Sequence, residues 1–264
     1  MSRMLIGWLI GCYAFLYAPI AFLVAFSFND SRLVSVWSGF STRWYAALWA
    51  DSALIEAALL SLRIAALSAC LATMIGALAG LALVRLGRFR GRGLMEVGLA
   101  APLVLPEVIT GLSLLMLFVA AERVFGWPGE RGATTVTLAH AAISIGYVAV
   151  VMRSRLVDMG TAVEEAAADL YAPPWVVFTR ITLPLAAPAL VSGWLLAFTL
   201  SLDDLVVASF TSGPGATTLP MAVFSATRLG ATPEIYALAT VIVAAVAAVL
   251  AVAGRLDRSA PPSR

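Results

Sequence analysis

The sequence contains no lysine, because all seventeen of its basic residues are arginines. A Walker A phosphate-binding loop needs a lysine that reaches the β- and γ-phosphates of a nucleotide. The glycine-rich segment 213–218 lacks this lysine, so we do not expect the chain to bind ATP. Any ATP-driven function then requires a motor on another subunit.

Charged residues are scarce, at 12% of the 264 residues, whereas 61% of the residues are hydrophobic. Soluble globular chains are about 25% charged and about 45–50% apolar. The hydrophobic residues form runs of membrane-spanning length, which predicts an all-α polytopic membrane protein. No basic run interleaved with aromatic residues indicates a nucleic-acid partner.

Only two cysteines and one histidine are present. Cys12 and Cys70 fall within apolar runs, where we expect small buried residues rather than metal ligands or a disulfide framework. His140 also falls within an apolar run, and we expect it to be packed or hydrogen-bonded there. The sequence therefore predicts no metal and no cofactor on this chain.

Six apolar segments fill most of the chain, which we interpret as one transmembrane domain over residues 1–264. The first is too long for a signal-peptide core and no cleavage site follows it, so we expect it to be retained. Pro102, Pro106 and Glu107 interrupt the third segment. Residues 153–188 form a loop within the domain. The six predicted spans cover residues 6–28, 57–84, 97–121, 133–152, 188–210 and 235–254.

The arginines predict how the spans are oriented, since cytoplasmic segments carry the excess of basic residues. With a cytoplasmic N-terminus, eleven arginines fall inside, five fall in outer loops and Arg63 falls in a span. We therefore expect both termini in the cytoplasm. The outer segment 30–56 is rich in aromatic residues, which predicts anchoring at the membrane–water boundary, contact with an external partner, or both. These residues are Trp37, Phe40, Trp44, Tyr45 and Trp49.

The loop 153–188 has the pattern of two short helices. Thr161 and Glu164 have the spacing of a capping box. A second helix is expected to begin at Pro174 and to end before Pro184. The first helix is amphipathic with an acidic polar face, which favours a protein-docking element over a helix lying on anionic lipid. Its apolar face is Val163, Ala166, Ala167 and Leu170, and its acids are Glu164, Glu165 and Asp169.

Glu165, Ala166 and Ala167, followed by Tyr171 and by Ile-Thr-Leu-Pro at 181–184, have the spacing of the EAA motif. The loop thus resembles that of the permease subunits of binding-protein-dependent ABC importers. The resemblance implies the type I ABC importer permease fold and a coupling helix in a cleft of the cytoplasmic ATPase. The implied coupling residues are Glu164, Glu165, Ala166, Ala167, Asp169, Tyr171, Ala172, Leu183 and Pro184.

One residue of the motif departs from the family. Members usually have glycine at the position of Tyr171, where a left-handed turn ends the helix. A tyrosine in that conformation costs about 1–2 kcal/mol. We therefore expect either a different turn, or a strain that is absorbed with help from Pro173 and Pro174.

The resemblance covers nearly the whole chain and is nearest to the polyamine permeases, the putrescine version above all. It implies a subunit that works with a sister permease, an ATPase dimer that uses ATP and Mg, and a periplasmic polyamine-binding protein. It also implies that the chain lies in a bacterial inner membrane, in contact with its lipid. A permease for another small cation or solute is the alternative. The matching segments are 15–19, 27–29, 44–45, 101–113, 192–204 and 212–220.

Three acids fall where lipid is expected. Residues 188–202 are uncharged and span about 22 Å as a helix, so Asp203 and Asp204 lie near or inside the outer edge of about 30 Å of hydrocarbon. The two aspartates would lie at a different depth if residues 205–210 remain outside the membrane as a separate segment. Glu107 lies within the third span. Such acids face a wet path or pair inside the protein, with Arg63 or with backbone groups as candidate partners.

Carboxylates along a path suit a polycation such as a polyamine, and aromatic rings add cation–π attraction. Neighbouring residues of a helix point about 100° apart, so both aspartates face one path only if the helix breaks there. The predicted path residues are Glu107, Trp194, Phe198, Asp203 and Asp204.

Two other classes of protein fit less well. An intramembrane hydrolase would use the two aspartates, or Ser113 with His140. Adjacent carboxylates diverge on a helix, and residues 111–113 lack the second glycine of a nucleophile elbow. A secondary transporter would show inverted repeats, which are not evident. We therefore expect a non-catalytic transport subunit.

Overall fold

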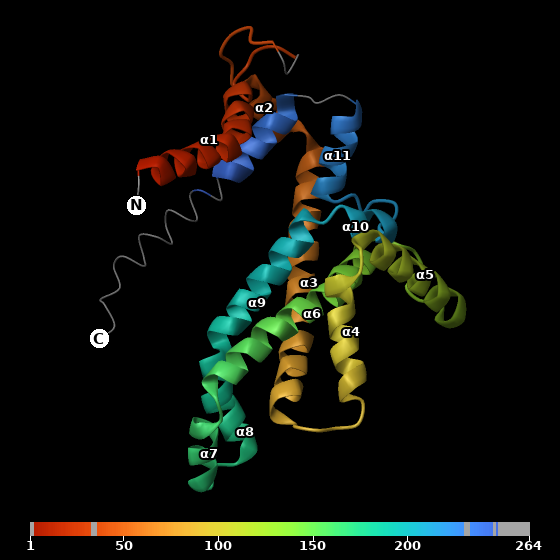
Figure 1. The fold of residues 1–264 in the computed structure, drawn as a ribbon. Helices are drawn as coiled ribbons and strands as arrows, with labels where there is room; N and C mark the ends of the chain where they lie inside the picture. The colour runs from red at the N-terminus through yellow and green to blue at the C-terminus, as the bar shows by residue number, and fades with distance from the viewer. Residues whose placement is uncertain (1–2, 33–35, 230–232, 245–246, 248–264) are drawn as a thin grey trace. The chain divides into compact units, whose positions relative to one another are not determined.

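The computed structural model describes residues 3–32, 36–229, 233–244 and 247, and these form helices joined by short turns (Figure 1). Within this part of the chain no β-strand occurs, only an isolated bridge between Asn29 and Phe40. The all-α prediction is therefore confirmed. The chain divides into two compact units, residues 1–56 with 223–264 and residues 57–222.

The first unit contains α1 (Arg3–Phe26) and α2 (Arg43–Ala50). After α1, the buried Asn29 donates from Nδ2 to the Val36 carbonyl at 2.6 Å and accepts the Ser38 N–H at 2.9 Å. Two of the predicted boundary aromatics form further hydrogen bonds beside Asn29. The Trp44 Nε1–H donates to the Asn29 carbonyl at 2.7 Å, and the Tyr45 hydroxyl lies 2.7 Å from Ser27 Oγ.

The second unit is built on the long helices α3 (Ser52–Arg85), α6 (Ala133–Met159) and α9 (Leu183–Asp203). Glycines let these helices approach closely, as small residues do between membrane helices. A Cβ on Gly76 of α3 would lie 2.8 Å from the Ile145 carbonyl oxygen of α6. The buried core between the three helices is Ala69, Ala72, Val148, Met152, Leu156, Ala186, Ala189 and Ala197.

Shorter helices complete this unit: α4 (Arg92–Val104), α5 (Glu107–Phe125) and α10 (Val206–Thr211). The helix α11 (Leu219–Leu229) begins in it. Helix α4 packs on α6, and α10 packs on both α5 and α6. Gly146 is necessary for the first contact, because a Cβ there would lie 2.3 Å from the Leu99 carbonyl oxygen.

Five helices of the described part are long and apolar enough to cross a membrane. The predicted third span is two helices, since Leu105 is extended before Pro106 and α5 begins after it (φ −73, ψ 141). Of the predicted sixth span, residues 235–244 lie in the apolar helix Pro233–Ala244. Residues 245–246 and 248–254 lie outside the described part. The five spanning helices are Met4–Phe26, Ser52–Arg85, Glu107–Phe125, Ala133–Met159 and Pro174–Asp203.

The predicted burial of the two cysteines is wrong for the chain by itself. Cys12 on α1 and Cys70 on α3 are free thiols at exposed positions. Both lie in apolar spans, so their surroundings are lipid or a neighbouring subunit rather than the core of this chain. Cys70 Sγ accepts a hydrogen bond from Trp194 Nε1 at 3.3 Å.

Candidate functional site: the coupling loop and an acidic helix end

Both predicted loop helices are present, as α7 (Ala162–Asp169) and α8 (Pro174–Val177), which lie together beyond the ends of α6 and α9 (Figure 1). The prediction that the second helix ends before Pro184 is wrong. A π-helical turn, Phe178–Thr182, continues α8 into α9. Pro184 removes a hydrogen bond from this part of the helix, and a wider turn accommodates such a loss.

The predicted capping box is wrong. Thr161 is the N-cap of α7, but no side chain caps the helix. The Glu164 carboxylate is instead 2.8 Å from Arg85 Nε and accepts a hydrogen bond from Thr182 Oγ1 at 2.7 Å. Arg85 also donates to the Gly160 carbonyl at 2.7 Å. A guanidinium binds a carboxylate more strongly than a backbone N–H does, so Glu164 joins α7 to α3 and to the π-helical turn.

The predicted apolar face of α7 is largely exposed. Leu170 is 82% exposed and Val163 is 55% exposed, while Glu164 and Ala167 are the half-buried positions. Large exposed hydrophobic residues on a helix outside the spanning segments indicate a contact surface for another molecule. Glu165 and Asp169 are exposed beside this face.

Tyr171 has the left-handed conformation of the family glycine, with φ +58. The turn is therefore retained, and Tyr171 takes the strained conformation. The N–H of Tyr171 bonds to the Ala168 carbonyl at 2.9 Å, and the N–H of Ala172 bonds to the Ala167 carbonyl at 3.1 Å. This pair of bonds is the Schellman motif, which satisfies the last carbonyls of a helix. The Tyr171 side chain is 95% exposed, so no contact within the chain repays the strain.

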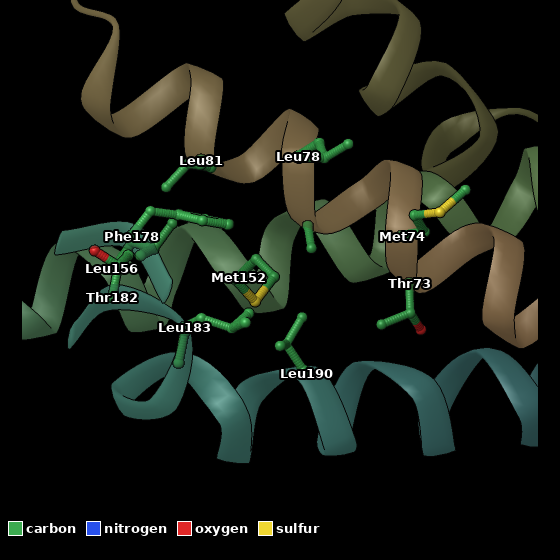
Figure 2. Close-up of a pocket in the computed structure, with 12 residues that line it drawn as sticks. Thr73, Met74, Leu78, Leu81, Met152, Leu156, Phe178, Thr182, Leu183 and Leu190 are labelled. Atoms are coloured by element: carbon green, nitrogen blue, oxygen red, sulfur yellow. The ribbon is translucent and has the colours of Figure 1, made fainter. Parts of the chain in front are cut away.

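A cavity of about 270 Å³ lies beside the loop (Figure 2). Phe178 and Thr182 of the π-helical turn line one part of it, and residues of α3, α6 and α9 line the rest. Its walls are almost wholly apolar and include no charged residue. A polyamine needs carboxylates or other polar partners, so this cavity does not suit such a cation.

The two aspartates lie at a helix break. Helix α9 ends at Asp203, the backbone of Asp204 is extended (φ −67, ψ 125), and α10 follows as a separate helix. The predicted span 188–210 is thus divided. Asp204 Oδ1 accepts the Ala208 N–H at 2.8 Å and lies 3.3 Å from His140 Nε2. Asp204 thus pairs with a backbone group, which the sequence analysis left open. Its side-chain partner is His140 rather than the expected Arg63.

Of the other predicted path residues, only Asp203 lies at this break. Asp203 is exposed, and Glu107 is exposed at the first residue of α5; neither forms an ion pair with any described residue. Trp194 and Phe198 stack on each other, with ring centroids 5.1 Å apart, and both pack against the α3–α6–α9 core. Their cation–π role stays a prediction.

The sequence does not predict three contacts of these arrangements. Arg85 and Thr182 are distant from Glu164 along the chain. Arg85 stands out only as one of the arginines predicted to be cytoplasmic, and Thr182 only as part of the motif segment 181–184. Ser201 lies 2.6 Å from His140 Nδ1, which confirms the prediction of a packed or hydrogen-bonded histidine. The pairing itself depends on how α6 and α9 pack, which no local pattern reveals.

Comparison with known proteins gives a consistent result. The family model described as binding-protein-dependent transport system inner membrane component matches residues 72–260. The putrescine transport system permease protein PotI of Escherichia coli (strain K12) is 58% identical over 234 residues, which are 89% of this chain and 83% of that protein. The spermidine/putrescine transport system permease protein PotC of Haemophilus influenzae is 43% identical over 231 residues, 88% of this chain and 87% of that protein.

Among solved structures, a chain of a bacterial ABC transporter involved in the import of the acidic polysaccharide alginate matches with a TM-score of 0.71. The match covers 99% of each chain at 15% sequence identity. At this identity the likeness shows the fold alone. The type I importer fold predicted from the sequence is confirmed as an ABC importer permease fold.

Proposed function

The chain belongs to the family of binding-protein-dependent transport system inner membrane components, a multi-pass, non-catalytic permease subunit, and we propose that it serves polyamine uptake, of putrescine more than of spermidine. The observation that supports putrescine as the substrate is the sequence identity of 58% to a putrescine permease, against 43% to a spermidine/putrescine permease. In this proposal a sister permease, which is a different chain, forms the other half of the path.

The loop of α7, α8 and the π-helical turn docks on a cytoplasmic ATPase dimer, which binds the ATP and Mg that this chain does not. The exposed residues Val163, Leu170 and Tyr171 enter the apolar part of that contact, and Glu165 and Asp169 lie at its rim. Movement then passes to the membrane by two connections. One is the Arg85–Glu164 ion pair to α3, and the other is the continuous helix Pro174–Asp203.

An ion pair and a continuous helix both suit rigid-body transmission of the ATPase movement. The predicted coupling surface is completed by Ala166, Ala167, Ala172, Leu183 and Pro184. Leu183 is 40% exposed at the start of α9, and Pro184 is exposed beside it. Both termini lie in the cytoplasm in this arrangement, and a periplasmic binding protein delivers the substrate from the other side.

The path for the cation runs past exposed carboxylates. Asp203 and Glu107 are the two acids of the predicted path that remain unpaired by any described residue. A charge at membrane depth is costly unless it faces water or a partner, so such acids favour a wet path. Each ammonium group of a polyamine replaces part of its lost hydration there.

Expression with the candidate partner subunits tests this function. The chain is purified in detergent by a tag on this chain alone, and ATP hydrolysis is measured with the binding protein and putrescine. We expect an ATPase to co-elute and its hydrolysis to rise with putrescine. Transport by the chain without any ATPase, or hydrolysis that responds to no polyamine, contradicts the proposal.

A further inference from the structure

His140 is a buried titratable residue in the first third of the spanning helix α6, with only 3% of its surface exposed. Its Nδ1 lies 2.6 Å from Ser201 Oγ on α9, and its Nε2 lies 3.3 Å from Asp204 Oδ1. An ionised carboxylate only accepts hydrogen bonds, so a proton on Nε2 suits the side that faces Asp204. The ring therefore has a polar partner on each side. The contact with Asp204 is mainly electrostatic, because its geometry is not that of a well-aligned hydrogen bond.

Asp204 connects three helices through one oxygen. Oδ1 faces His140 of α6 and accepts the Ala208 N–H of α10, directly after the end of α9. The side chain is 14% exposed. A carboxylate held in this way fixes where α10 begins, and it has little freedom to bind a passing cation.

Asp203 has the opposite environment, although it is the adjacent residue. It is exposed, and no described residue forms an ion pair with it. It is also the last residue of α9, where the helix dipole disfavours a negative charge. Two carboxylates beside one imidazole leave a net negative charge in either protonation state of the ring, and an organic ammonium group would neutralise it.

A second connection holds α10 independently of His140. Thr135 Oγ1 of α6 donates to the Thr211 carbonyl at 2.6 Å, and both residues are buried. On α5, the Cβ absent from Gly111 would lie 2.8 Å from the Phe210 ring. Helix α10 therefore remains on α5 and α6 when His140 is changed, and a substitution at His140 acts mainly on Asp204.

From this geometry we propose that His140 is a positioning residue for cation transfer, which holds Asp204 as the structural acid and leaves Asp203 to meet the ammonium groups of the substrate. The inference rests on the proposed function for the identity of the cation. The division of roles between the two aspartates rests on the contacts alone.

Two variants of similar size separate positioning from packing. His140→Gln keeps an N–H that reaches Asp204, whereas His140→Met fills the same space without a donor. Both are made in the complete importer, reconstituted in vesicles with the binding protein and ATP. We expect His140→Gln to retain putrescine uptake within about threefold and His140→Met to lower the maximal rate about tenfold or more. The apparent KM should change little, since the binding protein captures the substrate. Equal uptake by the two variants overturns the proposal.

A double-mutant cycle gives a readout that a packing role would not move. In an Asp204→Asn background, His140→Met should add less than about twofold to the loss of uptake, because the interaction is already absent. In a Glu130→Gln background, where the change is an exposed acid of the loop between α5 and α6, it should add its full effect. The same added loss in both backgrounds contradicts the proposal.

A labelling experiment tests the inference without reference to the substrate, and so separates its failure from a failure of the proposed function. Cys12 and Cys70 are replaced by serine, and cysteine is placed at Asp203 or Asp204 in turn. A positively charged thiol reagent should modify the cysteine at Asp203 at least about tenfold faster than the cysteine at Asp204. Equal rates in the assembled importer overturn the assignment of the exposed acid, whether or not putrescine is transported.

Discussion

Arg85 Nε and Glu164 Oε2 lie 2.8 Å apart, although 79 residues separate them in the chain. The two side chains are 17% and 18% exposed, so water screens their attraction only in part. Arg85 is the last residue of the spanning helix α3, and Glu164 lies in the first turn of α7. The pair is therefore a direct mechanical connection between the membrane domain and the loop proposed to bind the ATPase.

Glu164→Gln should uncouple ATP hydrolysis from uptake. The amide keeps the size of the side chain but removes its charge, which weakens the contacts to Arg85 and Thr182 by about 1–3 kcal/mol. The number of substrates transported per ATP, measured in vesicles, should fall while the ATPase still co-purifies. Glu130→Gln, which changes an exposed acid of the loop between α5 and α6, serves as the matched control. An unchanged ratio in Glu164→Gln would remove the ion pair from the coupling mechanism.

Tyr171→Gly should stabilise the loop. Glycine adopts the left-handed conformation without the cost of about 1–2 kcal/mol that tyrosine has, and its greater freedom when unfolded offsets part of the gain. Hydrogen exchange at the amides of Tyr171 and Ala172, which form the Schellman bonds, should slow about two- to fivefold. Tyr171→Ala is the control, because alanine keeps the strain; equal protection in both variants would show that no strain is relieved.

The same variant tests what the tyrosine does. Its side chain has no role within the chain, so the strain is retained for a contact outside it. Tyr171→Gly should therefore weaken binding of the ATPase, measured as the concentration needed for half-maximal assembly, even though the loop is more stable. Assembly at unchanged concentration would mean that the exposed ring does not contact the ATPase.

Glu165→Lys should abolish co-purification of the ATPase, or the hydrolysis that substrate stimulates. Glu165 is exposed beside the apolar face of α7, and a lysine there reverses the charge at the rim of the contact. Glu130→Lys makes the same change of charge in the loop between α5 and α6 and should leave both properties intact. If both persist in Glu165→Lys, this loop is not the coupling contact.

Gly146→Ala should destabilise the membrane domain. The new Cβ would lie 2.3 Å from the Leu99 carbonyl oxygen, so α4 and α6 would have to separate at a cost of about 1–3 kcal/mol. Gly98→Ala on α4 is the matched control, since nothing lies within 4 Å of its added Cβ. The thermal unfolding midpoint of the purified protein should fall in the first variant only. Equal midpoints would contradict the close α4–α6 contact.

The sequence predicts the helical class and the spans because apolar runs of this length have few alternatives in a membrane. It also locates both loop helices, since proline pairs and apolar spacing act locally. It fails at Glu164, where the local pattern favours a capping box and a distant arginine competes successfully for the same carboxylate. It fails in the same way at Pro184, where the helix continues through a wider turn instead of stopping.

For the acids, the sequence leaves the choice between path and pairing open, and the structure divides the two neighbours. Asp204 is paired with His140 and a backbone N–H, while Asp203 is exposed. This division depends on a helix break between two identical residues and on a histidine 64 positions earlier in the sequence. Spacing alone carries no information of that kind.

Uptake of labelled putrescine by the complete importer tests the central claim most directly. Vesicles hold this chain with its sister permease and ATPase dimer, the binding protein is outside, and ATP is inside. The account predicts ATP-dependent accumulation of putrescine, faster than that of spermidine at equal concentration, and its loss on Asp203→Asn with assembly preserved. Accumulation of neither polyamine by the assembled complex, or undiminished uptake by Asp203→Asn, would contradict it.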